Sequence, residues 1–138
     1  MASFNKFYPF VAALAAKKHN LGSDTLKVML SNTAPSVNNS VKTDITEIAS
    51  GNGYSAGGTA VTITSSSQSS GTYSLIGNDV VFTATGSVGP LRYAVLYNST
   101  ATNQDLIGWW DYGSSVTLAS GDTFTVDFDN VNGILQLS

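Results

Sequence analysis

The residues that could carry acid–base or metal chemistry are few and scattered along the chain. The sequence has no cysteine, one histidine and nine acidic residues among 138. Acid–base, nucleophilic and metal-assisted catalysis each need several such groups in one place. His19 follows an alanine-rich stretch of helical character, and an imidazole is stabilised at a helix C-terminus without any catalytic role. We therefore predict that the chain has no catalytic residue and is not an enzyme.

Three patterns resemble functional sites, and each has a simpler interpretation. Residues 127–133 alternate carboxylates and amides like a calcium loop, but Val131 stands at the fifth position and the closing glutamate is absent. Residues 51–58 fit only the alanine-ended form of the dinucleotide fingerprint and follow no clear strand. Glycoside hydrolysis would need two carboxylates about 5 to 10 Å apart. The candidates are Asp105, Asp111 and Asp122. Their spacing does not establish that distance, so no metal or cofactor site is predicted.

Composition argues against several classes of partner. Charged residues make up 11% of the chain and the net charge is −3, so the clustered lysines and arginines of a nucleic-acid-binding protein are missing. No stretch approaches the roughly 18 apolar residues of a membrane span. Lys17 and Lys18 follow the N-terminal apolar run without a small-residue cleavage site, which favours a mature helix over a signal peptide. We predict one domain over residues 1–138, with no nucleic-acid or membrane partner.

The order of the elements predicts a mainly β fold. We expect an antiparallel β-sandwich or jelly-roll-like barrel with one N-terminal α-helix. Residues 1–22 are assigned to an N-terminal arm and helix. The helix has Pro9 in its first turn, an alanine- and leucine-rich run from residue 10 to Lys18, and Gly22 as its predicted stop. Residues 23–138 are assigned to the sandwich, because apolar and polar residues alternate and turn residues recur at close intervals.

Three local features are predicted within the sandwich. Residues 32–58 are too long for a hairpin and indicate a crossover between sheets, with a short helical turn over residues 43–48. Residues 112–114 are predicted to form a turn between two strands. The serine tract at residues 65–70 predicts either a mobile hairpin tip or a serine-rich strand at an exposed edge.

Aromatic residues are concentrated in two stretches, residues 91–97 and 106–112, that are apolar on both strand faces. A strand buried on both faces needs a cover, which the N-terminal helix or another subunit must supply. Tyrosine and tryptophan are favoured in both settings. An exposed aromatic platform that stacks on sugars is a third interpretation. The residues assigned to this hypothetical interface are Phe4, Phe7, Tyr93, Tyr97, Trp109, Trp110 and Tyr112.

A resemblance to a known family is carried by five segments spread over nearly the whole chain. They are residues 25–35 (TLKVMLSNTAP), 51–54 (GNGY), 89–98 (GPLRYAVLYN), 106–113 (LIGWWDYG) and 121–128 (GDTFTVDF). These segments are similar to small virion structural proteins of tailed bacteriophages, most of all to a head decoration, or cement, protein. The resemblance implies binding to the outside of the capsid, commonly as trimers or dimers, and it carries no catalytic motif.

These observations together predict a non-enzymatic virion structural protein on the outer surface of the phage head. It would decorate and stabilise the bacteriophage capsid by bridging major capsid protein subunits, as a homo-oligomer in which a trimer is favoured over a dimer. The basic N-terminal stretch with Phe4 and Phe7 is the candidate contacting arm. The alternative is a phage tail or fibre component that binds host surface glycans, with Trp109, Trp110 and Tyr112 facing solvent. A glycosidase or depolymerase is the third class, and it would need convergent carboxylates.

Overall fold

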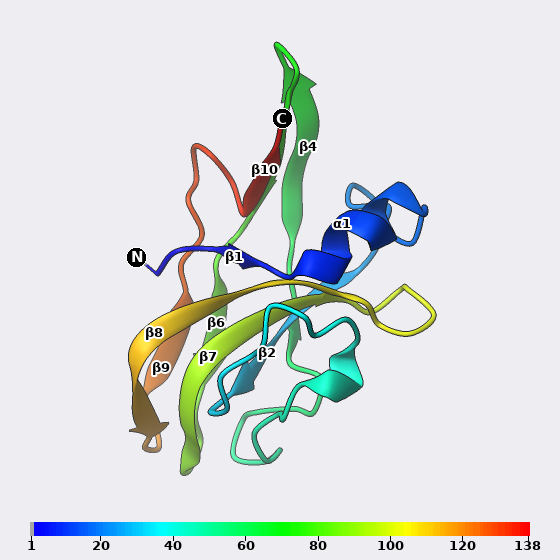
Figure 1. The fold of residues 1–138 in the computed structure, drawn as a ribbon. Helices are drawn as coiled ribbons and strands as arrows, with labels where there is room; N and C mark the ends of the chain where they lie inside the picture. Colours follow the sequence, from blue (N-terminus) through cyan, green and yellow to red (C-terminus); the bar gives the residue numbers. More distant parts are fainter. Residues whose placement is uncertain (1) are drawn as a thin grey trace.

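The computed structural model describes residues 2–138, so the first residue of the predicted N-terminal arm lies outside it. Within these residues the chain is mainly β, with antiparallel sheets and a single short α-helix near the N-terminus (Figure 1). This architecture is consistent with the predicted β-sandwich. The elements in chain order are β1 (Asn5–Lys6), α1 (Tyr8–Ala15), β2 (Leu26–Ser31), the 3-10 helix η1 (Lys42–Asp44), β3 (Thr59–Ala60), β4 (Ile63–Ser69), β5 (Thr72–Gly77), β6 (Val80–Thr83), β7 (Val88–Asn98), β8 (Leu106–Leu118), β9 (Thr123–Val126) and β10 (Leu135–Leu137).

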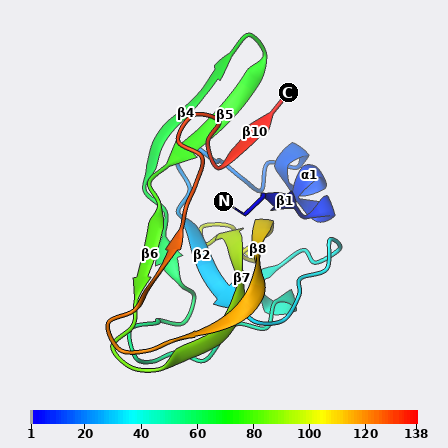
Figure 2. The ribbon, with the colours of Figure 1, turned by 90° about the vertical axis from the view of Figure 1, so that its left-hand side faces the viewer.

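The largest sheet has the strand order β1-β8-β7-β2-β3 and carries the core. Its central strands β2 and β7 pair antiparallel, with Val28 opposite Leu96, and both are buried over most of their length. Figure 2 shows strands β4, β5 and β6 on one side of this sheet and η1 on the other. Leu75 and Phe82, from the second layer, belong to the same hydrophobic cluster as the central strands. Burial on both faces of β2 and β7 therefore follows from cover on both sides.

Residues 32–58 do not cross between sheets, so that prediction is wrong. They leave β2 and return to β3, which pairs with the same strand through Ala60 opposite Lys27. On the way, Val37 and Ile45 pack against the core. The later part of the segment runs along the edge of β2, where the Tyr54 hydroxyl accepts a hydrogen bond from the Leu30 N–H and the buried Tyr54 ring lies against Phe82 of β6. The predicted helical turn is shorter than expected and forms η1. The chain first leaves this sheet between β3 and β4.

Helix α1 ends before the predicted Lys18, at Ala15. Lys17 adopts the left-handed conformation (φ 67°), and the Lys18 N–H donates to the Ala13 carbonyl oxygen five residues earlier, at 3.0 Å. This is the Schellman arrangement that closes a helix by satisfying its last carbonyl groups. This turn directs the His19 side chain into the protein, where the residue is 7% exposed.

Strand β8 is continuous, so the predicted turn at residues 112–114 is wrong. Tyr93 lies opposite Asp111 and Leu91 lies opposite Val116, so a step of two residues on β7 matches a step of five on β8. The three additional residues form a bulge, which increases the local bend of a strand without ending it. Gly113 lies in this bulge with a φ of 89°, a conformation that glycine adopts without steric cost.

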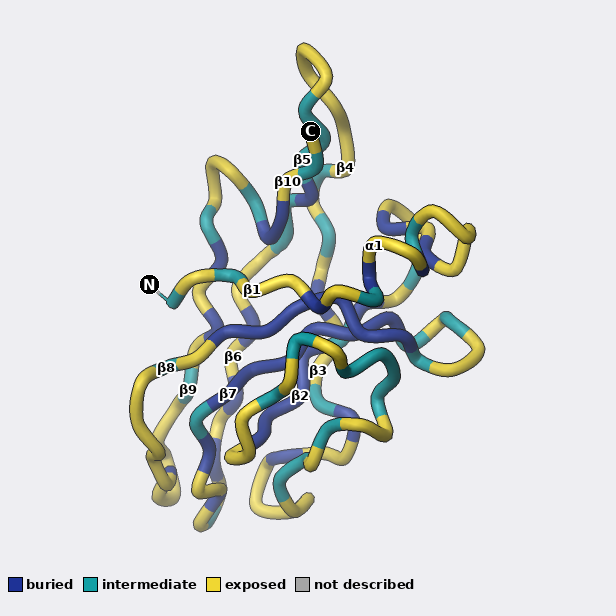
Figure 3. Tube along the Cα trace, in the orientation of Figure 1, coloured by how far each residue is buried: buried dark blue, intermediate teal, exposed yellow. Residues whose placement is uncertain are grey.

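Strands β4 and β5 form the serine hairpin (residues 63–77), which projects beyond the rest of the molecule (Figure 1). Its two-residue turn places Ser70 and Gly71 at φ values of 51° and 83°, as the type I′ turns of twisted hairpins require. Of the two predictions for the serine tract, the exposed edge strand is confirmed, because β4 is the outer strand of the sheet β10-β5-β4. Figure 3 shows the outer part of β4 and the turn exposed and the start of β5 partly buried.

Candidate functional site: the serine hairpin and the pocket at its base

The N-terminal segment is part of the fold rather than a free arm. Strand β1 pairs with β8, placing Asn5 opposite Trp109. Phe7 is 0% exposed, and its ring centre lies 4.6 Å from that of Trp109. Phe4 is partly buried, with its ring edge-on to Trp110 at 5.4 Å. These contacts assign both phenylalanines to the cover of the aromatic strand, so we do not retain them as residues that contact a partner.

The other aromatic residues assigned to an interface are also covered within the chain. Tyr93 is 8% exposed, and Tyr97 is fully buried with its hydroxyl donating to the Gly57 carbonyl oxygen at 2.6 Å. Burial raises the pKa of Tyr97 to about 12. Tyr112 is half-buried, edge-on to Phe124 at 4.8 Å, and burial also raises its pKa to about 12. The cover of these strands therefore comes from the chain itself, and it includes the N-terminal segment and residues 32–58.

The three candidate carboxylates lie in different places. Asp111 is on the exposed face of β8 and forms an ion pair with Arg92 at 2.8 Å, which holds the pKa of this carboxyl below its usual range. Asp122 accepts a hydrogen bond from the Ala119 N–H within a turn. Asp105 precedes β8, six residues from Asp111, which corresponds to about 20 Å of extended chain. This separation does not provide the carboxylate pair of a glycosidase.

In the calcium-like loop (residues 127–133) and the glycine-rich loop (residues 51–58), polar groups that could bind a ligand form hydrogen bonds within the protein. Asp129 accepts from the N–H groups of Val131 and Asn132, both at 2.8 Å, and these bonds lower the pKa of its carboxyl. The Gly57 N–H donates to the Glu47 carboxylate at 2.6 Å, so it is directed into the protein instead of toward a phosphate. Among residues 2–138 no group of three histidine or acidic side chains is arranged to hold a metal ion.

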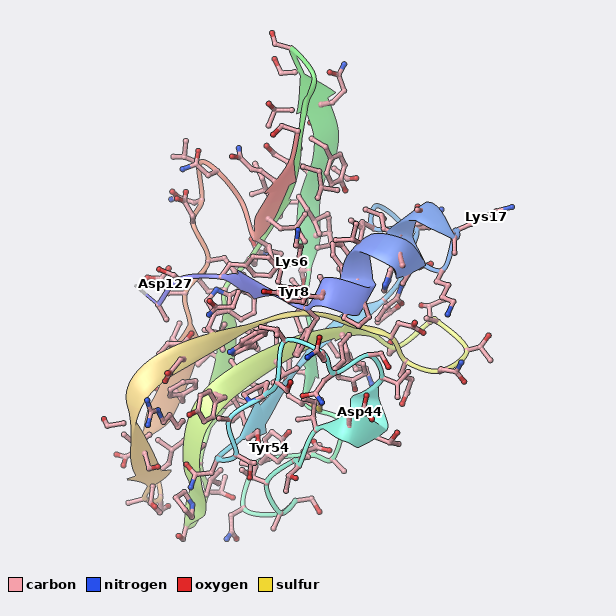
Figure 4. The ribbon with its side chains drawn as sticks, in the orientation of Figure 1. Lys6, Tyr8, Lys17, Asp44, Tyr54 and Asp127 are labelled. Carbon is pink, nitrogen blue, oxygen red and sulfur yellow. The ribbon has the colours of Figure 1, made fainter. Side chains whose placement is uncertain are left out.

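A pocket of about 810 Å³ lies at the base of the serine hairpin. Its walls come from the loop after α1, the connection between β7 and β8, and the side chains of Ser66 and Tyr73 on the hairpin. The Ser66 and Tyr73 hydroxyl groups are hydrogen-bonded at 2.7 Å. Lys17 stands at the outer end of the loop after α1 and points away from the molecule (Figure 4). The pocket volume falls in the range of small-molecule sites.

The buried polar network beside this pocket is centred on Asn98. Its side-chain amide nitrogen lies 3.0 Å from His19 Nδ1 and donates to Asp24 Oδ2 at 2.7 Å. Because an amide nitrogen only donates, His19 Nδ1 accepts and the proton of the neutral ring resides on Nε2. Burial lowers the pKa of His19, an effect that the nearby Asp105 and Asp24 carboxylates oppose in part. His19 Nε2 is buried and has no hydrogen-bond partner.

This network fixes the loops that surround the pocket. The Asn98 side-chain oxygen accepts from the N–H groups of Thr100 and Ala101, which pins the start of the β7–β8 connection. Asp105 is 6% exposed and lies 3.8 Å from the Lys18 ammonium group. His19, Asp24 and Asp105 are among the residues that line the pocket, and the Nε2 atom of His19 is buried there without a hydrogen-bond partner. Sequence reasoning missed this network because Asn98 lies 79 residues from His19.

The serine hairpin is an exposed, uncharged surface. Its side chains from Ser66 to the turn are exposed on β4, and charged residues are absent between Ile48 and Asn78. The chain matches no family model, no curated protein and no solved structure. No helix in the described part of the chain is long and apolar enough to cross a membrane. The function is therefore argued from the geometry of this surface and from the resemblance given above.

Proposed function

We propose that the protein is a non-enzymatic virion structural protein that decorates the bacteriophage head. In this role it bridges major capsid protein subunits on the outer surface and stabilises the lattice, as a homo-oligomer and without a cofactor. The observation that carries the proposal is the projecting, uncharged serine hairpin, which is mostly exposed within its own chain. The outer strand β4 has a neighbour on one side only, which leaves its other edge available to an external surface.

Two further observations support a structural role. The groups most capable of chemistry are engaged in the fold: His19 and Asp105 are buried, and Asp111 is paired with Arg92. The aromatic residues fill the core instead of lining an open platform. The tail or fibre alternative required Trp109 and Trp110 to face solvent, yet they are 9% and 3% exposed, so no observation favours that second function.

Binding through hydroxyl groups and backbone would behave differently from binding through ion pairs. Each contact is weak, but a capsid repeats it at many equivalent sites, and linked weak contacts produce high overall affinity. Salt screens attraction between exposed charges over about 8 to 10 Å, whereas hydrogen bonds and apolar contacts are far less sensitive. We therefore expect attachment to heads to change little with salt concentration.

The test is co-sedimentation of the purified protein with expanded phage heads that lack it, at low and high salt. The informative variant replaces residues 68–73 by Asn-Gly, which keeps a two-residue turn beside the Ser67–Ser74 pair and removes the outer part of the hairpin. We expect the full protein to bind at both salt concentrations and the shortened one to lose binding. A Val131→Ser control, at a residue 77% exposed elsewhere, should bind normally. Equal binding by the shortened protein, or attachment to tails alone, would refute the proposal.

A further inference from the structure

The outer edge of β4 carries backbone groups that have no partner within residues 2–138. Strand β4 is last in the order β10-β5-β4. Ser69 and Thr72 flank the two-residue turn and form a hydrogen-bonded pair. Hydrogen-bonded and non-hydrogen-bonded pairs alternate in an antiparallel ladder, so Gln68 and Tyr73, the next pair, form no backbone hydrogen bonds with each other. By the same alternation, the N–H and C=O groups of Ser66 and Gln68 point away from β5 toward the open edge. These groups form the open edge of the serine hairpin.

This open edge lacks the features that normally protect an exposed strand. Edge strands are commonly blocked by charged side chains, proline or a bulge. Residues 48–78 contain no charged residue and no proline. The irregularity in β4 lies between Ile63 and Ser65, at the base of the hairpin, and the register from Ser65 to Ser69 is regular. The open edge is therefore competent to pair with another strand.

The opposite side of the hairpin is already paired. Strand β10 lies beside β5 from Tyr73 to Leu75, so toward the tip only the Ser69–Thr72 pair and the turn lack a third strand. The β4 side has no such neighbour, and added strands stabilise a small sheet. A partner on the β4 side would add a strand where none is present.

The chemistry of the open edge favours a second copy of this chain as the partner. Serine hydroxyl groups both donate and accept hydrogen bonds, so the Ser-Ser-Ser-Gln-Ser sequence is complementary to itself in more than one antiparallel register. Serine and threonine pairs across neighbouring strands are stabilising. Two copies, each with a net charge of −3, repel one another, and the uncharged hairpin is where they can approach at least cost.

We propose that two copies pair through their open β4 edges in antiparallel orientation. The two three-stranded sheets would then join into one sheet, with a two-fold axis between the β4 strands. Such a contact is closed and symmetric, and it makes a dimer rather than the trimer favoured by the resemblance. The pairing does not depend on a capsid, so it is tested in purified protein and its failure is distinct from a failure to bind phage heads.

The first test uses charge complementation at two exposed positions of β4. One variant carries Ser67→Lys and Ser69→Lys, and the other carries Ser67→Glu and Ser69→Glu. Like charges on adjacent strands destabilise pairing, so each variant alone should be monomeric by sedimentation equilibrium at low salt, where the unmodified protein is dimeric. An equal mixture of the two should restore the dimer. The control Thr123→Lys with Thr125→Lys adds the same charge on exposed positions of β9 and should remain dimeric.

The second test removes a backbone donor from the open edge. Gln68→Pro deletes an N–H that points away from β5, and proline is tolerated where the N–H of an edge strand faces solvent. We expect the melting temperature to stay near that of Gln68→Thr while dimerisation is lost. Gln68→Thr is the matched control, because it also removes the side-chain bond to the Gly71 N–H but keeps the backbone donor. An unmodified protein that is monomeric at about 1 mM, or charged variants that dimerise separately, would overturn the proposal.

Discussion

Replacing Phe7 with alanine should destabilise the protein strongly, although Phe7 lies only seven residues from the start of the sequence. Its side chain is fully buried against Trp109 and beside the five-stranded sheet. Burial of a phenylalanine contributes about 1.5 to 3 kcal/mol, and a close aromatic pair adds about 0.5 to 1.5 kcal/mol. The remaining cavity adds a further penalty, so Phe7→Ala should lower the free energy of unfolding by about 3 to 5 kcal/mol.

The neighbouring residue provides the control. Tyr8 is 64% exposed at the start of α1, so Tyr8→Ala should change stability by less than about 0.5 kcal/mol. Urea unfolding of both variants, followed by tryptophan fluorescence, reports the difference directly because Trp109 contacts Phe7. Domains of this size are stabilised by about 5 to 15 kcal/mol in total, so the expected loss is easy to measure. Equal midpoints for the two variants would show that the N-terminal segment does not cover the sheet.

Three further outcomes follow from the same contacts. Gly58→Ala should lower the free energy of unfolding, measured in urea, by at least about 3 kcal/mol, because the added Cβ would lie 1.8 Å from the Val28 carbonyl oxygen at a φ of 80°. Gly121→Ala is the control: it has a φ of 90° but open space around it, and it should cost about 1 to 2 kcal/mol. Tyr97→Phe should cost about 1 to 3 kcal/mol by leaving the buried Gly57 carbonyl unpaired, and it should remove one tyrosine that ionises near pH 12 in an absorbance titration. Because burial lowers the pKa of His19 from 6.5, the unfolded chain takes up its proton first: stability should be constant above about pH 6.5 and decline as the pH falls toward the lower folded pKa, with a shallower decline in His19→Gln. Identical melting curves of these two proteins from pH 8 to 5 would contradict that assignment.

The sequence predicted the strands well wherever the pattern of apolar and polar residues within a strand shows which of its faces are buried. The alternation in β6 corresponds to Val80 and Phe82 buried and their neighbours exposed, as period-two spacing requires. The apolar residues on both faces of residues 91–97 and 106–110, in β7 and β8, correctly indicated cover on both sides. Sequence spacing was sufficient here because the signal lies within a single strand.

Features that depend on distant contacts were not predicted. The helix was expected to reach Lys18. The local composition does not indicate that Lys17 adopts a left-handed conformation, which ends the helix earlier. The bulge of β8 arises from its register with β7, and residues 112–114 alone suggested a turn. His19 carried the ordinary signal of a helix end, while its burial depends on Asn98, which a different part of the chain supplies. These are tertiary effects, and they override local preference.

The position of Phe7 also decides which truncation can test the function. Removing the residues before Pro9 would delete β1 and the aromatic cover of β8, so lost capsid binding would report unfolding as readily as a lost contact. Shortening the serine hairpin reduces this ambiguity, because residues 68–72 are exposed or half-exposed; Tyr73, which is also removed, packs against the core, so unfolding must be measured on the same variant. A shortened protein with unchanged unfolding and no capsid binding separates attachment from stability. If the hairpin also mediates pairing of two copies, the same variant becomes monomeric, whereas the Lys and Glu variants mixed together should recover both pairing and binding.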